Sequence, residues 1–253
     1  MVLLTAVAEA GSIESSFFSR GYIGFGIGVP LILGKHYIDS STEDLTATTL
    51  SVLPAVEVNI GKVGFIGDFH GGYGHTFPDT FYLGGELFLE WYTLSTRINL
   101  SRTVAFNGTT LLTPEFYQIR IKSAYGLLVH PGWQVTTDSL IYLSLGPTIG
   151  RLRNNSHMSF IILPGTPTST PLFIFEHDKD QRKLGFRTGI GTVLLLSEHW
   201  AFRLEYLYTH YGHFGASKVF FKIPLTNNPF TMVTDNSATF SVHAVTANVD
   251  FFF

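Results

Sequence analysis

The residues that could carry chemistry lie on stretches whose side chains alternate between two faces. Asp68 and His70 share one such face, and a serine such as Ser144 could complete an acid, histidine and serine set for acyl transfer. An interior aspartate beside a histidine is more often part of a hydrogen-bonded network. The network is the stronger interpretation, so we expect no catalytic residue and no enzyme.

A second candidate is the pair of histidines in "THYGH". The spacing of His210 and His213 suits a metal ion, but on a continuing strand an odd separation sends two side chains to opposite faces. The glycines of "GFGIG" do not form a nucleotide loop, because no helical pattern follows them. We therefore expect neither a metal nor a cofactor.

Charged residues form the largest polar set. In "RLEYLYTHYGH", Arg203 and Glu205 fall on one side of an alternating strand, where a sandwich core would hold apolar residues. The same side of the other strands carries the acids Asp68, Glu86, Glu90 and Asp250 and the bases Arg120, Lys122 and Arg187. This mixture predicts a cross-strand ion-pair network in a polar interior.

Composition narrows the fold class. The chain has 253 residues, 45% of them hydrophobic and only 14% charged, with 25 Gly, 23 Phe, 11 Tyr and no Cys. That is apolar and aromatic for a soluble domain. Polar residues or glycines interrupt every apolar run before it reaches the ~18 residues of a spanning helix. The net charge of -3 gives no reason to expect nucleic acid.

Alternation of period two recurs along the chain and predicts eight strands. In the first, Ile23, Phe25, Ile27 and Val29 oppose small or polar residues. The predicted strands cover residues 20–31, 63–75, 81–92, 117–129, 139–152, 184–196, 200–209 and 238–253. Because the polar sides are rich in Gly, Ser, Thr and Tyr, the apolar sides are expected to face lipid and the polar sides a lumen.

An all-β, antiparallel, up-and-down transmembrane barrel follows, because backbone groups in lipid must be paired and the sheet must close. Residues 76–80, 130–138 and 197–199 are short connections, whereas 32–62, 93–116, 153–183 and 214–237 are long. This asymmetry is typical of such barrels. Ten strands are the alternative, if residues 48–61 and 97–106 both cross the membrane.

The first residues differ from the rest. Residues 1–10 look like the remnant of a signal peptide, with Ala8, Glu9 and Ala10 at the spacing of a cleavage site. A disordered leader is the alternative. Residues 11–253 are expected to form a single barrel domain.

Four stretches carry a resemblance to a known family: "GYIGFGIG", "GGYGHTFPDTFYLGGELFL", "FRLEYLYTHYG" and the terminal phenylalanine. The chain resembles the outer-membrane-protein-A-like and opacity-like eight-stranded barrels of Gram-negative bacteria. The resemblance implies the bacterial outer membrane and a structural, surface-adhesive or small-pore role. Lipid-modifying barrels of the lipid A acylase or deacylase type are the alternative.

The same resemblance implies partners. They are outer membrane lipid or lipopolysaccharide, the barrel assembly machinery reading Phe253, Phe251 and Val249, and a host or cell-surface ligand bound by the long loops. The loop at 154–181 holds an apolar stretch that suits such a contact. It equally suits a hairpin that extends the barrel above the membrane.

Overall fold

The computed structural model describes residues 17–43, 53–106, 109–163, 173–215, 219–223 and 230–253. The predicted leader, residues 1–10, lies outside them. The described residues form ten strands and one short 3-10 helix, η1 (Pro78–Thr80). The strands are β1 (Gly21–Glu43), β2 (Leu53–Val63), β3 (Ile66–Thr76), β4 (Phe81–Phe106), β5 (Thr109–Thr136), β6 (Ser139–Leu163), β7 (Phe173–Leu195), β8 (Trp200–Gly215), β9 (Val219–Ile223) and β10 (Phe230–Phe252).

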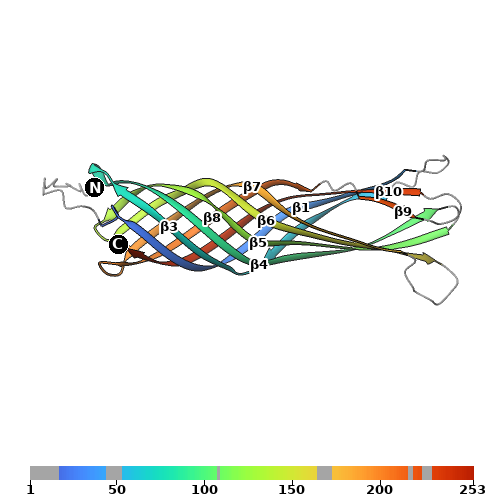
Figure 1. The fold of residues 1–253 in the computed structure, drawn as a ribbon, viewed down its shortest axis with the longest axis horizontal. Helices are drawn as coiled ribbons and strands as arrows, with labels where there is room; N and C mark the ends of the chain where they lie inside the picture. Colours follow the sequence, from blue (N-terminus) through green and yellow to red (C-terminus); the bar gives the residue numbers. More distant parts are fainter. Residues whose placement is uncertain (1–16, 44–52, 107–108, 164–172, 216–218, 224–229) are drawn as a thin grey trace, which may run out of the picture.

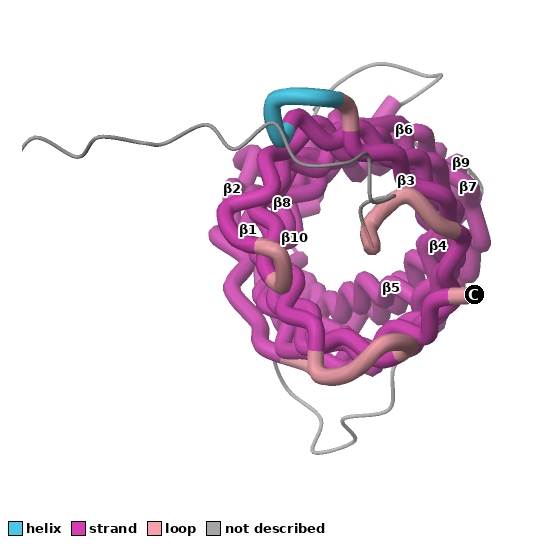
Figure 2. The backbone as a smooth tube through the Cα atoms, turned by 90° about the vertical axis from the view of Figure 1, so that its left-hand side faces the viewer, coloured by secondary structure: helices cyan, strands magenta, loops and turns pink. Residues whose placement is uncertain are grey.

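The strands form one closed antiparallel sheet. Their order is β2-β1-β3-β4-β5-β6-β7-β8-β10-β9, and β1 also pairs with β10 from Tyr22↔Phe252 to Glu43↔Thr231. This pairing of the first strand with the last closes the ring (Figure 2). The predicted all-β barrel is therefore confirmed. Among the described residues, no helix is long and apolar enough to cross a membrane.

The barrel has eight strands, because β2 and β9 are continuations of other strands. β1 pairs with β3 over Gly21–Gly28 and with β2 over Leu31–Ser40, so β2 and β3 follow each other along the same neighbour. In the same way β8 and β9 both pair with β10. Without β2 and β9, the ten strands of the described sheet make a ring of eight. The ten-stranded alternative is therefore wrong.

An apolar belt surrounds one half of the molecule. Its outward side chains are exposed, among them Ile23, Phe25, Ile27, Val29, Phe69, Leu87, Leu127, Ile141, Ile190, Leu204 and Val245. Trp133 pairs with Phe81 and Trp200 with Phe251, beside the short turns and the C-terminus, whereas Trp91, Tyr125 and Phe186 lie farther along β4, β5 and β7, toward the other end. Such a belt between aromatic girdles is the lipid-facing surface of a transmembrane barrel.

The strands continue far past this belt. β4, β5 and β6 have 26, 28 and 25 residues, although about 11 tilted residues span a bilayer. The prediction of four long loops is therefore wrong over the described residues: most of 32–62, 93–116, 153–183 and 214–237 is strand that forms an extension of the barrel (Figure 1). For 154–181 the hairpin interpretation is the correct one.

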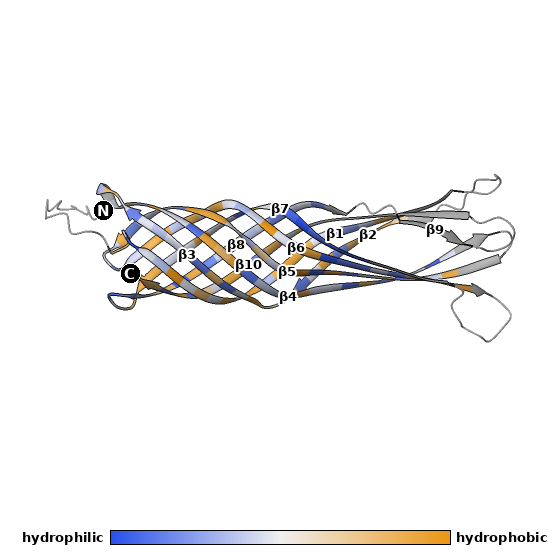
Figure 3. Cartoon of the chain, viewed as in Figure 1, coloured by the Kyte–Doolittle hydropathy of each residue, from blue (hydrophilic) through white to orange (hydrophobic). Residues whose placement is uncertain are grey.

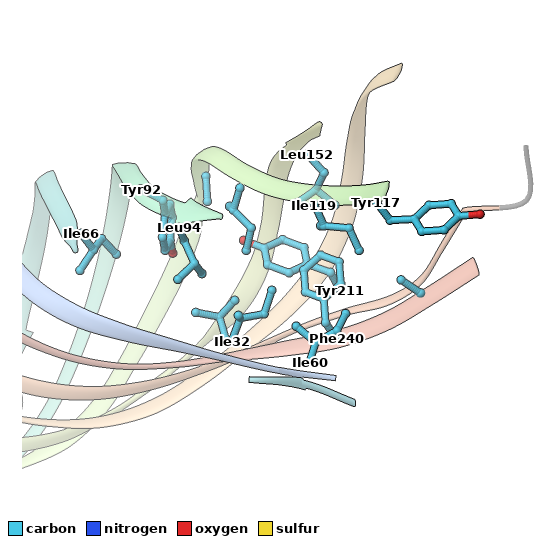
Figure 4. Close-up of a cluster of buried hydrophobic side chains, with 14 of the residues drawn as sticks. Ile32, Ile60, Ile66, Tyr92, Leu94, Tyr117, Ile119, Leu152, Tyr211 and Phe240 are labelled. Carbon is cyan, nitrogen blue, oxygen red and sulfur yellow. The ribbon is translucent and has the colours of Figure 1, made fainter. Parts of the chain in front are cut away.

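A packed interior explains why the extension is ordered sheet. Ile32, Leu94, Tyr117, Ile119 and Phe240 point inward and belong to one buried apolar cluster (Figure 4). Arg102 adds a buried ion pair to Glu115, with Nη2–Oε1 at 2.6 Å. Burial on this scale offsets the entropy of ordering the strands.

Aromatic side chains close the end with the short turns. Phe18, only 1% exposed, packs edge-on against Tyr82 and Phe252, with ring centroids 6.4 Å apart in both pairs. The hydroxyl of Ser19 accepts a 2.9 Å hydrogen bond from the backbone N–H of Thr76 and holds the loop in place. Figure 2 shows this loop inside the ring.

Candidate functional site

The interior beneath the apolar cluster holds a first charged layer, centred on Arg203 of β8. Its guanidinium donates to Glu86 of β4 and, through Nε at 2.8 Å, to Asp250 of β10. Tyr22 donates to the same Glu86 at 2.9 Å, and its ring lies 4.9 Å beneath the guanidinium carbon. All four side chains are at most 5% exposed. One arginine thus ties three strands together across the lumen.

His70 extends this layer across β3. Its Nε2 lies 2.8 Å from Asp250, and its Nδ1 lies 2.8 Å from Asp68. Ionised carboxylates only accept hydrogen bonds, so with both ionised the two ring nitrogens must donate. His70 is then an imidazolium and supplies the positive charge that two aspartates on this side require.

Glu205 organises the opposite side of the layer. It accepts hydrogen bonds from Tyr142 at 2.6 Å, from Asn248 at 3.2 Å and from Ser144 at 3.4 Å. The Ser144 hydroxyl also lies 3.2 Å from Nδ1 of His130, while it makes no described contact with His70. The serine is 0% exposed. The acid, histidine and serine set of Asp68, His70 and Ser144 is therefore not assembled.

A second charged layer is centred on Arg187 of β7. Two of its nitrogens donate to the two oxygens of Glu90, both at 2.6 Å, and Nε donates to Thr209 at 2.9 Å. Tyr92 donates to Glu90 at 2.6 Å, and the guanidinium carbon lies 4.2 Å from the centroid of the Phe88 ring. A bidentate pair of this kind is among the strongest side-chain hydrogen bonds.

Glycine provides the space for the first layer. A Cβ on Gly24 would approach both Asp250 and His70 to 2.3 Å, and one on Gly191 would lie 2.5 Å from the Tyr142 ring. A side chain at either position would displace the network. The alternating glycines of "GYIGFGIG" therefore leave room for the side chains of the network that fills the lumen.

Seven of the nine predicted network residues point into the lumen: Asp68, Glu86, Glu90, Arg187, Arg203, Glu205 and Asp250. Analysis of the sequence placed His70 beside Asp68 but missed the partners His130, Tyr22 and Tyr142. The inward position of these residues in the alternation was the available signal. Two arginines and the imidazolium of His70 face five carboxylates, so the layers are more acidic than the predicted balance.

The prediction that Arg120 and Lys122 point into the lumen is wrong. Ile121 pairs with Leu152 and Ser123 with Arg151, so Lys122 is an extra residue of β5 with no partner on β6. This bulge reverses the alternation beyond it. Ile119 and Ile121 are buried, Arg120 is exposed, and Lys122 forms an outer ion pair with Asp180 at 3.0 Å.

A second bulge changes the placement of the two histidines. Gly212 has a positive φ of 63°, and the register of β8 with β10 shifts between Thr239↔His213 and Ser241↔His210. His210 and His213 are consequently both exposed, contrary to the expected opposite faces. No group of three possible metal ligands gathers among the residues that the structure describes.

Comparison with known proteins identifies the family. The family model described as outer membrane protein beta-barrel domain matches residues 1–253. The chain belongs to this family. The predicted family and its location in the bacterial outer membrane are thereby confirmed, and the end with the short turns faces the periplasm.

Several solved structures are similar to the chain at low identity, and no curated protein matches the chain in sequence. Ail of Yersinia pestis, in complex with the heparin analogue sucrose octasulfate, is 12% identical, with 92% of this chain and 99% of that chain covered and a TM-score of 0.33. OprG of Pseudomonas aeruginosa is 13% identical, with 95% and 99% covered and a TM-score of 0.40. Neisserial surface protein A is 10% identical, with 88% and 97% covered and a TM-score of 0.30.

Proposed function

We propose that this outer membrane barrel is a closed, structural and surface-contact protein rather than a diffusion porin. The observation that carries the proposal is the filled lumen. The Arg203 layer, the Arg187 layer and the apolar cluster lie in series within the described barrel. Between the first layer and the periplasmic aromatic residues, the cavity beside Tyr22, Tyr82 and Arg203 holds about 10 Å³, which is room for about one water molecule.

The extension supports the surface-contact part of the proposal. Its strands carry the sheet well beyond the lipid belt, so the far ends of β4, β5 and β6 stand clear of the membrane. Surface loops on a rigid scaffold are where binding residues concentrate. A host or cell-surface ligand is accordingly the partner class that this part of the protein suits.

Conductance in planar bilayers tests the closed lumen. We expect the refolded wild-type protein to give only small or intermittent current steps, because three filled layers must open together for an ion to pass. Inserting a known open porin into the same bilayer provides the positive control. A large and steady conductance from the wild-type protein would refute the proposal.

The lipid-modifying alternative has a weaker basis. Ser144 and His130 are close enough to hydrogen-bond, but they are 0% and 2% exposed within the plugged interior. An acyl ester in the outer leaflet would have to reach them through the barrel wall. Lipid A that keeps its acyl chains after incubation with the refolded protein, analysed by mass spectrometry, is the expected result.

The last residues are proposed as an assembly signal. Phe253 is 68% exposed at the periplasmic rim, and Phe251 and Val249 lie on the same outward side of β10. Deletion of Phe253 is expected to lower the amount of folded protein in the outer membrane of cells several-fold, while refolding into detergent stays nearly unchanged. Phe253→Tyr keeps the ring and serves as the control. Equal insertion of the deletion variant would exclude the signal role.

A further inference from the structure

The extension divides into two sheets. Over the described residues no strand pairing joins β2 to β4 or β7 to β9. The N–H of Thr93 donates to the carbonyl of Phe65 at 2.9 Å at the base of the first boundary, and the pair Phe186↔His210 ends the β7–β8 ladder at the base of the second. Beyond these points β1, β2, β9 and β10 form one sheet, here called the β1 sheet, and β4, β5, β6 and β7 form the other, the β5 sheet (Figure 1).

Side chains hold the two sheets together. The β1 sheet contributes Ile38, Ile60 and Phe240 to the buried apolar cluster, and the β5 sheet contributes Ile98, Tyr117 and Ile119. Figure 3 shows hydrophobic and hydrophilic residues next to one another along the strands where they leave the barrel half, as expected if one side faces the opposite sheet and the other faces water. Because the sheets are joined through side chains, burial of apolar surface determines whether they stay together.

His36 of β1 lies at this interface. It is 1% exposed, and its ring meets that of Tyr117 on the opposite sheet edge-on, with centroids 5.3 Å apart. The adjacent Lys35 points outward and pairs with Glu57 at 2.7 Å, so this part of β1 lies beyond the apolar belt. The Nδ1 atom of His36 has no hydrogen-bond partner within the described part of the chain. The imidazole therefore packs between the sheets as a neutral ring.

A proton on His36 would have no counter-ion. The titratable or charged side chains that share its interior are Tyr117 and Glu115 of β5, Arg102 of β4 and Tyr211 of β8, and its strand neighbours Val58 and Ala238 are uncharged. Glu115 already accepts hydrogen bonds from Nε of Arg102 at 2.8 Å and from the hydroxyl of Tyr117 at 2.8 Å. Burial without a partner lowers the pKa of His36 to about 4.

The sign of the pH dependence follows. A histidine in water titrates near pH 6.5, so the closed arrangement, in which the pKa is lower, is fully stabilised above that pH. This stabilisation is lost as the pH falls from about 6.5 to about 4. The equilibrium constant for opening should then rise about 20-fold from pH 7 to pH 5, toward a limit of about 300-fold at lower pH.

We propose that the extension is an acid-sensitive switch, in which protonation of His36 separates the β1 sheet from the β5 sheet and exposes their apolar inner sides at the cell surface. The eight-stranded ring in the membrane stays closed, because its strands pair on both sides and its charged layers lie elsewhere. The switch is separate from the proposed function, since it does not depend on whether the lumen conducts.

Thiol labelling tests the switch, because the chain has no cysteine of its own. Ile98→Cys places a reporter on the inner side of the β5 sheet, where the side chain is 7% exposed. The full chain, refolded in lipid vesicles, is treated at pH 7 and pH 5 with a dithiodipyridine, which also reacts with protonated thiols, and rates are divided by those of a free thiol. We expect the normalised rate to rise about 20-fold at pH 5.

A second reporter separates opening of the extension from unfolding of the protein. Ser144→Cys lies in the first charged layer at a position that is 0% exposed, and it should stay unlabelled at both pH values. Labelling of this reporter at pH 5 at the rate of Ile98→Cys would show global unfolding and would overturn the proposal.

Variants of the histidine complete the test. In the Ile98→Cys background, His36→Phe keeps an apolar ring and His36→Gln stays neutral, so both should label equally at pH 7 and pH 5. His210→Phe is the matched control, because His210 is exposed on the outer side of β8 beside Ser241, and it should keep the 20-fold rise of about the wild-type size. A wild-type rate that does not change with pH, or an unchanged rise in both His36 variants, would refute the switch. The shift between heated and unheated samples in SDS gels establishes that each variant is folded.

Discussion

Replacing Arg203 with alanine is expected to lower the free energy of unfolding by about 3 to 5 kcal/mol. The substitution leaves Glu86 and Asp250 buried without their shared cation, and both are at most 4% exposed. An uncompensated buried charge costs far more than the lost hydrogen bonds alone. Urea titration of the protein folded in lipid vesicles, followed by tryptophan fluorescence, measures the change.

A control variant and a conductance measurement make the result specific. Arg151→Ala removes an arginine of equal size from the outer surface, where its ion pair with Asp180 is exposed, and should cost less than about 1 kcal/mol. Conductance should stay low in Arg203→Ala, because the Arg187 layer and the apolar cluster still close the lumen. Equal stability of the Arg203→Ala and Arg151→Ala variants would contradict the structural role of the first layer.

A comparably large effect is expected at the second layer. Arg187→Met retains the bulk of the side chain but strands Glu90, which is 1% exposed, and should destabilise the protein by about 3 to 5 kcal/mol. Glu90→Gln in the same chain removes the stranded charge. The double variant should therefore recover a large part of the loss, and the same urea titrations measure it.

The two single variants and the double variant form a mutant cycle that isolates the pair. A coupling of about 2 kcal/mol or more is expected for a bidentate pair that has left water. Thr188→Ala, one residue along β7 with a half-buried side chain, is the control outside the pair. Additive effects of Arg187→Met and Glu90→Gln would show that the pair does not act as a unit.

Much of the fold was predictable from local pattern. Period-two alternation located all eight strands. In the membrane-spanning half of the barrel it also predicted correctly which side chains face the lumen and which face lipid, as with Arg203 and Glu205 inside and Leu204 and Tyr206 outside. The pattern works there because lipid outside and a polar lumen inside make opposite demands on neighbouring residues. This rule alone predicts the inward position of seven of the nine proposed network residues.

The rule fails where the surroundings change. Beyond the membrane the interior is apolar and the exterior is wet, so Ile119 and Ile121 turn inward although they share the parity of the lipid-facing Tyr125 and Leu127. A single extra residue at Lys122 makes the reversal. From the sequence alone, a strand with uninterrupted alternation cannot be distinguished from a strand with a bulge when alternate positions on both sides of the bulge are apolar.

The sequence by itself therefore determined the class of fold, the strands in the membrane and the lumen-facing side of their membrane-spanning parts, because these depend on side-chain alternation along one strand. Only the tertiary structure decided which lumen charges form ion pairs, such as Arg203 with Glu86 and Asp250, and which predicted lumen cations lie on the outer surface instead. Those contacts depend on the register between strands and on the position of bulges. Register is a property of pairs of strands closed into a ring, so it has no signature within any one strand.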